Sequence, residues 1–175
     1  MVSRLLGVLA GLVAVFGGFV ATRPGPYRVE RSTVIAAPVR QVYGVLESLQ
    51  NWPRWSPWEE LDPDIERTFR GPRAGIGAQL AWRGNSQVGK GTLQISAATP
   101  PTHLRFMTLF EEPWQATMQS DFQLRAVPEG CRVSWVLSGK RRFWGKLFTL
   151  FYDLDQRAGA DLERGLGRLQ KLVTP

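Results

Sequence analysis

Residues 114–126 read WQATMQSDFQLRA and alternate between two kinds of side chain. Because side chains of a β-strand point to opposite faces in turn, this pattern predicts a strand. One face carries Trp114, Ala116, Met118, Ser120, Phe122 and Leu124, and the other face carries only polar side chains. A strand of this kind belongs to an antiparallel sheet that is covered on one face and meets water on the other.

The neighbouring segments repeat this pattern, with turn sequences rich in Gly and Pro between them. Strand candidates precede residues 114–126 at 27–35, 65–69, 78–82, 91–97 and 103–110, and one more follows at 131–138. β-Branched and aromatic residues bounded by turn residues are typical of strands. Together these segments predict a curved antiparallel sheet of about seven strands.

Two helices are expected beside these strands. Pro38 suits a helix start, and Val39, Val42 and Leu46 follow at helical spacing, which predicts a short helix over residues 38–49. Near the C-terminus, apolar residues recur every three or four positions over residues 147–172, with charged residues between them. This spacing predicts one long amphipathic helix that covers the sheet, giving an α+β domain.

The N-terminal segment has a different composition. Residues 5–21 read LLGVLAGLVAVFGGFVA and contain no charged side chain. A transmembrane helix needs about 20 apolar residues, and no convincing signal-peptidase site follows, so we favour an uncleaved membrane anchor over a removed signal peptide. A buried helix of the domain fits less well, since the run has no polar face. We therefore divide the chain into an anchor or signal-like segment (1–22), a Pro- and Gly-rich linker (23–26) and one domain (27–175).

The side of the membrane is less well determined. Arg23, Arg28 and Arg31 follow the apolar run, whereas Arg4 alone precedes it, and this distribution leans toward a cytoplasmic domain. Export of the domain is the alternative. The single Cys131 is compatible with either compartment, because it has no intramolecular disulfide partner.

The chain is basic, with a formal net charge of +7. An anionic membrane surface is the expected partner, and no nucleic acid is expected, because the basic residues are dispersed and no nucleic-acid-binding motif accompanies them. One cluster of cations and rings, GKRRFWGK (139–146), predicts contact with a membrane surface through Lys140, Arg141, Arg142, Phe143 and Trp144. The alternative is a solvated loop before the long helix.

Motifs for cofactors and catalysis are missing. The segment GNSQVGKG (84–91) approaches a phosphate-binding loop, but Gly91 replaces the metal-binding hydroxyl and a strand follows instead of a helix. With one His and one Cys in the chain, we expect no metal site, and His103 is expected to be a solvated turn residue. No cofactor and no catalytic residues are predicted.

The stretch NWPRWSPW (51–58) places three tryptophans beside two prolines. Pro53 and Pro57 exclude a regular helix through the stretch, so we expect a turn or cap that carries large apolar rings. The rings of Trp52, Trp55 and Trp58 could line a ligand site, fill the core or touch a membrane. The covered faces of the predicted strands are almost free of titratable groups, which suits an apolar ligand held by a few polar groups. A solid core is an equally good interpretation of the same side chains.

The order of these elements resembles the SRPBCC superfamily, the START-related and polyketide-cyclase-like proteins. The resemblance is carried by IAAPVRQVYGVLESLQNWPRWSPW (35–58), GIGAQLAW (75–82), VGKGTLQI (88–95), TPPTHLRF (99–106) and DQRAGADLERGLGRLQKL (155–172). It implies a helix-grip fold with a cavity between the sheet and the long helix. Superfamily members bind lipids, sterols, hormones or polyketides, and a minority catalyse cyclisation or dehydration of such ligands.

We therefore expect a membrane-tethered binding module for a hydrophobic small molecule or lipid. The residues expected to line its cavity are Trp52, Trp55, Trp58, Leu80, Trp82, Leu93, Phe106, Met118, Phe122, Trp135, Phe151 and Leu154. One alternative is a cyclase- or dehydratase-like enzyme, for which Tyr43, Thr108 and Ser120 are the weak polar candidates. The other is a scaffold with a filled core.

Overall fold

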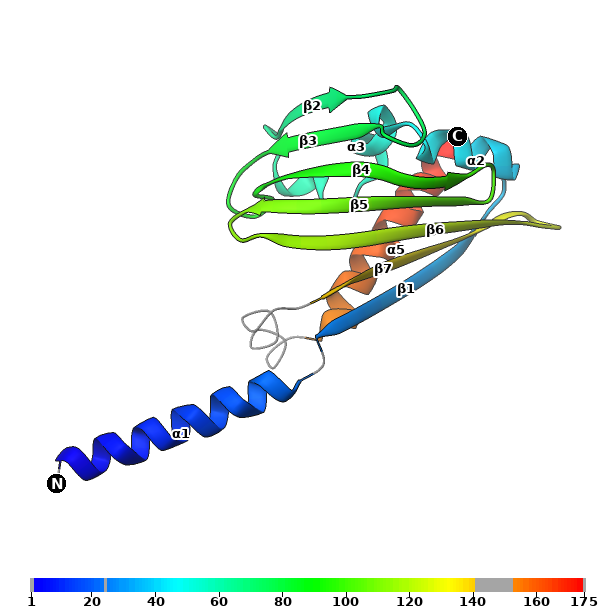
Figure 1. The fold of residues 1–175 in the computed structure, drawn as a ribbon. Helices are drawn as coiled ribbons and strands as arrows, with labels where there is room; N and C mark the ends of the chain where they lie inside the picture. The colour runs from blue at the N-terminus through cyan, green and yellow to red at the C-terminus, as the bar shows by residue number, and fades with distance from the viewer. Residues whose placement is uncertain (1, 24, 141–152, 175) are drawn as a thin grey trace.

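A computed structural model of the chain describes residues 2–23, 25–140 and 153–174. One curved antiparallel sheet and one long helix form the domain, and helix α1 extends away from them (Figure 1). The strands are β1 (Pro26–Ile35), β2 (Glu66–Arg70), β3 (Gln79–Arg83), β4 (Lys90–Thr99), β5 (His103–Glu112), β6 (Ala116–Val127) and β7 (Gly130–Lys140). The predicted α+β helix-grip fold is confirmed for this domain.

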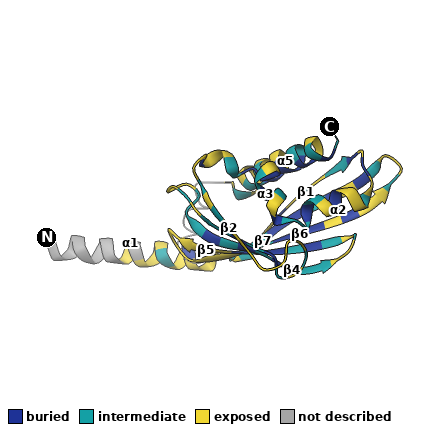
Figure 2. Cartoon of the chain, turned by 90° about the horizontal axis from the view of Figure 1, so that it is seen from above, coloured by how far each residue is buried: buried dark blue, intermediate teal, exposed yellow. Residues whose placement is uncertain are grey.

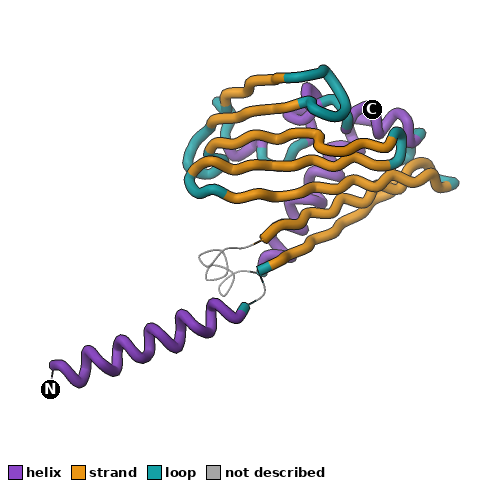
Figure 3. The backbone as a smooth tube through the Cα atoms, viewed as in Figure 1, coloured by secondary structure: helices purple, strands orange, loops and turns teal. Residues whose placement is uncertain are grey.

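The sheet has the strand order β1-β7-β6-β5-β4-β3-β2, so every hairpin from β2 to β7 pairs neighbours in sequence. Figure 3 shows the strands wrapping around the helices on one side. On β6, Ser120, Phe122 and Leu124 are buried and Gln123 and Arg125 are exposed, which matches the predicted alternation. Trp114 precedes the strand and is 67% exposed, because the turn after Pro113 extends two residues further than the pattern indicated.

The segment between β1 and β2 contains only short helices. These are α2 (Val39–Leu46), η1 (Leu49–Asn51), α3 (Trp52–Trp55) and η2 (Glu59–Leu61). A single helical turn therefore forms within NWPRWSPW, where a turn or cap was expected. Pro53 is tolerated because it lies in the first turn, where its missing N–H has no intrahelical partner to lose.

Helix α5 (Leu154–Val173) begins at Asp153, whose side chain accepts a hydrogen bond from the Gln156 amide at 3.1 Å. The predicted first part of this helix, from Leu147, lies outside the described residues. Figure 2 shows α5 lying over the concave face of the sheet with its buried side turned inward. A Cβ atom at Gly165 would lie 2.7 Å from the Trp135 ring, so this glycine allows the helix to approach β7 closely.

Aromatic rings fill the core beneath α5. Trp55, Phe106, Phe122 and Trp135 are each at most 1% exposed. The Phe122 and Trp135 rings stack at 4.8 Å between centroids, and Trp55 meets Trp135 edge-on at 5.6 Å. Offset and edge-to-face contacts of this kind are favourable geometries for aromatic pairs, so this end of the domain is tightly packed.

Helix α1 (Val2–Thr22) forms over the predicted anchor segment, and Leu12, Val15, Phe16 and Phe19 on it are exposed. Among the residues that the structure describes, none of the helices combines the length and the apolar character needed to cross a membrane.

The outer face of the sheet carries a polar cluster around Asp121. Its carboxylate lies 3.0 Å from His103 Nε2 and 2.8 Å from Arg105 Nε, and it accepts a hydrogen bond from Gln119 at 2.5 Å. Burial alone would raise the pKa of Asp121, but the hydrogen bonds from Gln119, Arg105 and His103 outweigh it and lower this pKa. His103 is thus a half-buried strand residue, and the expectation of a solvated turn was wrong.

We expect the Asp121→Asn variant to be less stable than the wild type at pH 7, with a difference that narrows in acid. Because the folded-state pKa of Asp121 is lowered, the stabilisation is fully present above the unfolded-state pKa of about 3.9 and is lost as pH falls through the folded-state value. Urea unfolding between neutral pH and acid measures this. Asp64→Asn removes the same charge at an exposed site and serves as the control. A difference that does not change with pH would contradict the prediction.

Candidate functional site

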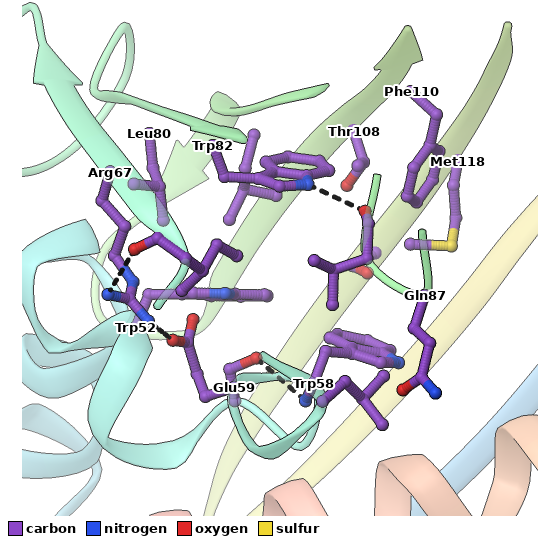
Figure 4. Close-up of a pocket in the computed structure, with 16 residues that line it drawn as sticks. Trp52, Trp58, Glu59, Arg67, Leu80, Trp82, Gln87, Thr108, Phe110 and Met118 are labelled. Carbon is purple, nitrogen blue, oxygen red and sulfur yellow. Dashed lines mark hydrogen bonds and ion pairs between the residues drawn. The ribbon is translucent and has the colours of Figure 1, made fainter. Parts of the chain in front are cut away.

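A cavity of about 240 Å³ lies between the concave face of the sheet and the segment that follows α3. Figure 4 shows it with side chains converging from the two sides. Its walls are formed by Trp52, Ser56, Trp58, Glu59, Leu61, Ile65, Arg67, Leu80, Trp82, Gln87, Val88, Leu93, Thr108, Phe110, Met118 and Ser120. The described part of α5 contributes no wall residue, so the cavity lies beside this helix and not beneath it.

The strand register explains the floor of the cavity. Leu80, Leu93, Thr108 and Met118 pair in sequence across β3, β4, β5 and β6, which places them in one row on the inner face. The next row toward the strand ends holds Trp82, Gly91 and Phe110. Gly91 is needed here, because a Cβ atom would lie 2.6 Å from the Trp82 ring. The glycine thus lets this indole pack closely against β4.

Three indoles surround the open volume. Trp52 and Trp58 come from the α3 segment, with nearly parallel rings whose centroids are 6.2 Å apart. Trp82 comes from β3, and its Nε1 donates a hydrogen bond to the Val88 carbonyl at 3.1 Å (Figure 4). Large rings on the walls with few polar groups are typical of pockets that bind apolar small molecules.

Buried hydroxyl groups interrupt this apolar wall. Ser56 Oγ accepts a hydrogen bond from the Trp58 amide at 3.3 Å, and two more hydroxyls lie on the sheet. Thr108 on β5 is 4% exposed and Ser120 on β6 is 1% exposed. Among the residues that the structure describes, neither hydroxyl has a hydrogen-bond partner. Both hydroxyls are therefore available to bond a polar group of a ligand that enters the cavity.

The edge of the cavity carries an ion pair. Arg67 Nη2 on β2 bonds the Glu59 carboxylate, and Arg67 Nη1 donates to the Ile65 carbonyl at 3.1 Å. Both side chains lie on the wall, at its β2 end. Because the two charges compensate each other, this end of the cavity is polar without carrying a net charge.

The turn between β3 and β4 closes one side of the cavity. The Asp62 carboxylate, in a residue only 7% exposed, accepts a hydrogen bond from the Asn85 amide at 2.6 Å, and the Asn85 side chain donates to the Leu61 carbonyl at 2.9 Å. These bonds tie residues 84–89 to the segment after α3 and hold Gln87 and Val88 over the cavity. The near-match to a phosphate-binding loop is therefore a hairpin turn, as the sequence indicated.

The predicted ligand residues fall into three groups. Trp52, Trp58, Leu80, Trp82, Leu93 and Met118 line the cavity. The structure instead places Trp55, Phe106, Phe122 and Trp135 in the aromatic core and half-buried Leu154 at the start of α5, none of them on the cavity wall. Phe151 lies outside the described residues.

The predicted membrane-surface cluster is largely outside the described residues as well. Lys140 is exposed at the end of β7, and residues 141–144 are not described. Within the described ranges, no group of three or more metal-ligating side chains is present.

Several residues of the cavity wall were not predicted from the sequence. Ser56, Glu59, Leu61, Ile65, Arg67, Gln87, Val88 and Phe110 line the cavity without having been predicted. Phe110 has a sequence signal, since it continues the inward series of Phe106 and Thr108 on β5. The others lie in turns, in the short helix η2 or at the short edge strand β2, and these segments are too short for periodicity to show which way a side chain points.

Comparison with known proteins identifies relatives of the domain. A family model described as "Polyketide cyclase / dehydrase and lipid transport" matches residues 26–174. A search of curated proteins finds no match.

Solved structures share the fold at low sequence identity. A Chromobacterium violaceum protein is 17% identical with a TM-score of 0.60, and the match covers 87% of this chain and 99% of that one. A Bacillus halodurans protein is 14% identical with a TM-score of 0.61, covering 86% and 99%. A Mycobacterium smegmatis protein is 16% identical with a TM-score of 0.58, covering 84% and 90%. At these identities the likeness extends to the fold alone.

Proposed function

Since the chain belongs to the polyketide cyclase/dehydrase and lipid transport family of the SRPBCC superfamily, we propose that it is a membrane-tethered module that binds a small hydrophobic molecule. The observation that carries the proposal is the cavity itself. Its walls come from the sheet, from the segment after α3 and from the turn at residues 84–89, and they are apolar except for a few polar groups. A space with these walls favours an apolar ligand that replaces unfavourable contacts with water.

The volume limits the size of the ligand. Ligand pockets commonly span about 300–1,000 Å³, so a cavity of about 240 Å³ is slightly smaller than this range. A compound of two fused rings or a short acyl chain suits this space, whereas a sterol or a two-chain lipid would have to leave part of its surface outside.

Tethering is supported by the N-terminal segment. Residues 5–21 contain no charge, and the exposed side chains of Leu12, Val15 and Phe16 on α1 make an apolar surface that is costly to leave in water. The linker at residues 23–26 then joins this segment to β1. We expect the domain to lie on the cytoplasmic side, since most of the cations near the apolar run follow it.

One experiment tests both parts of this proposal. Cells that express the full chain are separated into a carbonate-washed membrane fraction and a soluble fraction, and the purified protein is then analysed by native mass spectrometry. We expect the chain in the membrane fraction, with an apolar compound bound to it. Recovery of the chain in the soluble fraction would contradict the tether, and repeated absence of any bound compound would contradict the binding function.

An enzyme of the cyclase or dehydratase type is the second candidate, and Glu59 is the observation that favours it. Glu59 is the one carboxylate on the cavity wall among the described residues, and a carboxylate beside a bound compound is suited to proton transfer. Binding is the better-supported function because Arg67 already bonds this carboxylate. In the experiment described above, an enzyme would release the bound compound in a chemically converted form, whereas a binding module would release it unchanged.

A further inference from the structure

Thr108 and Ser120 are the buried hydroxyls on the sheet side of the cavity. The third buried hydroxyl on the wall, Ser56, already accepts a hydrogen bond from the Trp58 amide at 3.3 Å. Glu59 and Arg67 bond each other, the Trp82 N–H bonds Val88, and Gln87 is exposed at the turn. Thr108 and Ser120 are buried residues on the apolar part of the wall, and neither hydroxyl has a hydrogen-bond partner among the described residues. Arg67 Nε also lacks a partner, but it lies at the ion-paired β2 end of the cavity. When a ligand fills the cavity, a hydroxyl that no protein group bonds would be desolvated without a partner, and a ligand oxygen at hydrogen-bond distance would compensate this cost.

Their placement makes the two hydroxyls neighbours. Ser120 pairs with Phe106 and Thr108 pairs with Met118 across β5 and β6. Thr108 and Ser120 are therefore diagonal neighbours on one face of the sheet, at a separation of about 7–8 Å between Cα atoms. Two hydroxyls at this spacing are able to bond a single ligand oxygen from two sides, because each hydroxyl both donates and accepts.

The surroundings exclude a charged group at this position. Leu93 and Met118 flank Thr108 in its row, and Phe106 and Leu137 flank Ser120 in the next. The nearest cation on the described wall, Arg67, stands on β2, three strands from Thr108, which is about 14 Å at the usual strand spacing. Glu59 also neutralises it. A ligand carboxylate or phosphate at the hydroxyl pair would be buried without a counter-ion, at high cost.

We propose that Thr108 and Ser120 form a polar subsite that selects a neutral ligand with one hydrogen-bonding oxygen at its buried end, such as a phenol, an alcohol or a ketone. This inference rests on the proposed binding function and specifies the chemistry of its ligand. The apolar remainder of the ligand lies against Leu80, Leu93 and the three indoles. The Glu59–Arg67 end of the cavity then meets the opposite end of the ligand.

The test compares probes that share one ring system and differ in a single group. Full-length protein in phosphatidylcholine nanodiscs is dialysed to equilibrium against naphthalene, against 2-naphthol and against 2-naphthoate, with empty nanodiscs as the blank. We expect 2-naphthol to bind, and 2-naphthoate to bind at least about tenfold more weakly, because its charge has no partner. Tighter binding of 2-naphthoate than of 2-naphthol would overturn the proposal and identify the site as one for anions.

The variants separate the subsite from the cavity as a whole. In the double variant Thr108→Val with Ser120→Ala, we expect the ratio of the naphthalene Kd to the 2-naphthol Kd to fall about tenfold, since each lost hydrogen bond is worth about two- to tenfold. Thr117→Val with Ser134→Ala makes the same chemical changes on the outer face of β6 and β7 and should leave this ratio unchanged. Thr108→Ser keeps the hydroxyl and should keep the wild-type preference, which guards against a variant that merely folds poorly.

The possible outcomes distinguish two failures. If the wild type binds both neutral probes and the double variant leaves their ratio unchanged, the subsite is wrong and the binding function stands. If the wild type binds none of the three probes, the binding function fails together with the subsite.

Discussion

Replacing Trp135 by Ala is expected to lower the free energy of unfolding by about 3–4 kcal/mol. Trp135 is fully buried, and its ring contacts Phe122, Trp55 and Trp58. The substitution removes a large apolar surface and leaves a void that the surrounding rings and the closely packed helix at Gly165 fill only in part. Urea unfolding followed by circular dichroism measures the difference.

We expect this loss of stability to be near the lower end of the range for truncating a buried tryptophan. Trp135 Nε1 is buried and has no hydrogen-bond partner among the described residues, so the variant also removes an unfavourable donor. Trp135→Phe also loses the N–H, but it keeps one six-membered ring and leaves a smaller void, so it should cost about 1–2 kcal/mol. Trp114→Ala, at a site that is 67% exposed, is the control and should change the stability by less than about 1 kcal/mol. Equal losses in Trp135→Ala and Trp114→Ala would contradict the role assigned to the core ring.

The sequence was sufficient for the fold because the sheet repeats a local signal. On β5 and β6, most residues at every second position are apolar, and the burial of Leu104, Phe106, Phe122 and Leu124 follows this alternation. Turn residues separate the strands, so the order of the elements could be determined without knowledge of long-range contacts. The same alternation correctly indicated that Leu93 and Met118 face inward.

The alternation could not show which inward residues face the cavity and which fill the core. Phe122 and Met118 lie on the same face of β6, four residues apart, yet Phe122 is packed against Trp55 and Trp135 while Met118 borders the cavity. The difference depends on which elements lie above each position: Trp55 of α3 packs against Phe122, whereas Met118 borders the cavity. Sequence periodicity shows which face of a strand a residue occupies, but it does not show which element packs against that face.

The tryptophan stretch shows the same limit within a single helical turn. Trp52 and Trp58 line the cavity, and Trp55 between them lies in the core, 4.7 Å from the Trp52 ring. Pro53 and Pro57 determine that the chain turns here, but the direction of each ring depends on the packing of α3 against α5. Two of the three roles that the sequence left open are therefore combined here, since two of the rings line the cavity and the third lies in the core.

Replacing Met118 by Trp is expected to abolish most probe binding while the protein remains folded. Met118 is half-buried on the cavity wall, and a larger, rigid ring at this position would occupy part of the cavity of about 240 Å³. If the new ring displaces about 100 Å² of the naphthalene surface, the loss at about 25 cal/mol per Å² is about 2.5 kcal/mol, or roughly 70-fold in Kd. Equilibrium dialysis of naphthalene against the full-length protein in nanodiscs measures it.

The adjacent residue provides a matched control, because neighbours along a strand point to opposite faces. Thr117 is exposed on the outer face of β6, so Thr117→Trp adds the same ring to the same strand outside the cavity. We expect Thr117→Trp to bind naphthalene with the wild-type Kd. If Met118→Trp also kept that Kd, the bound probe would have to lie somewhere other than this cavity. A loss in both variants would instead attribute the effect to the strand and not to the space that Met118 borders.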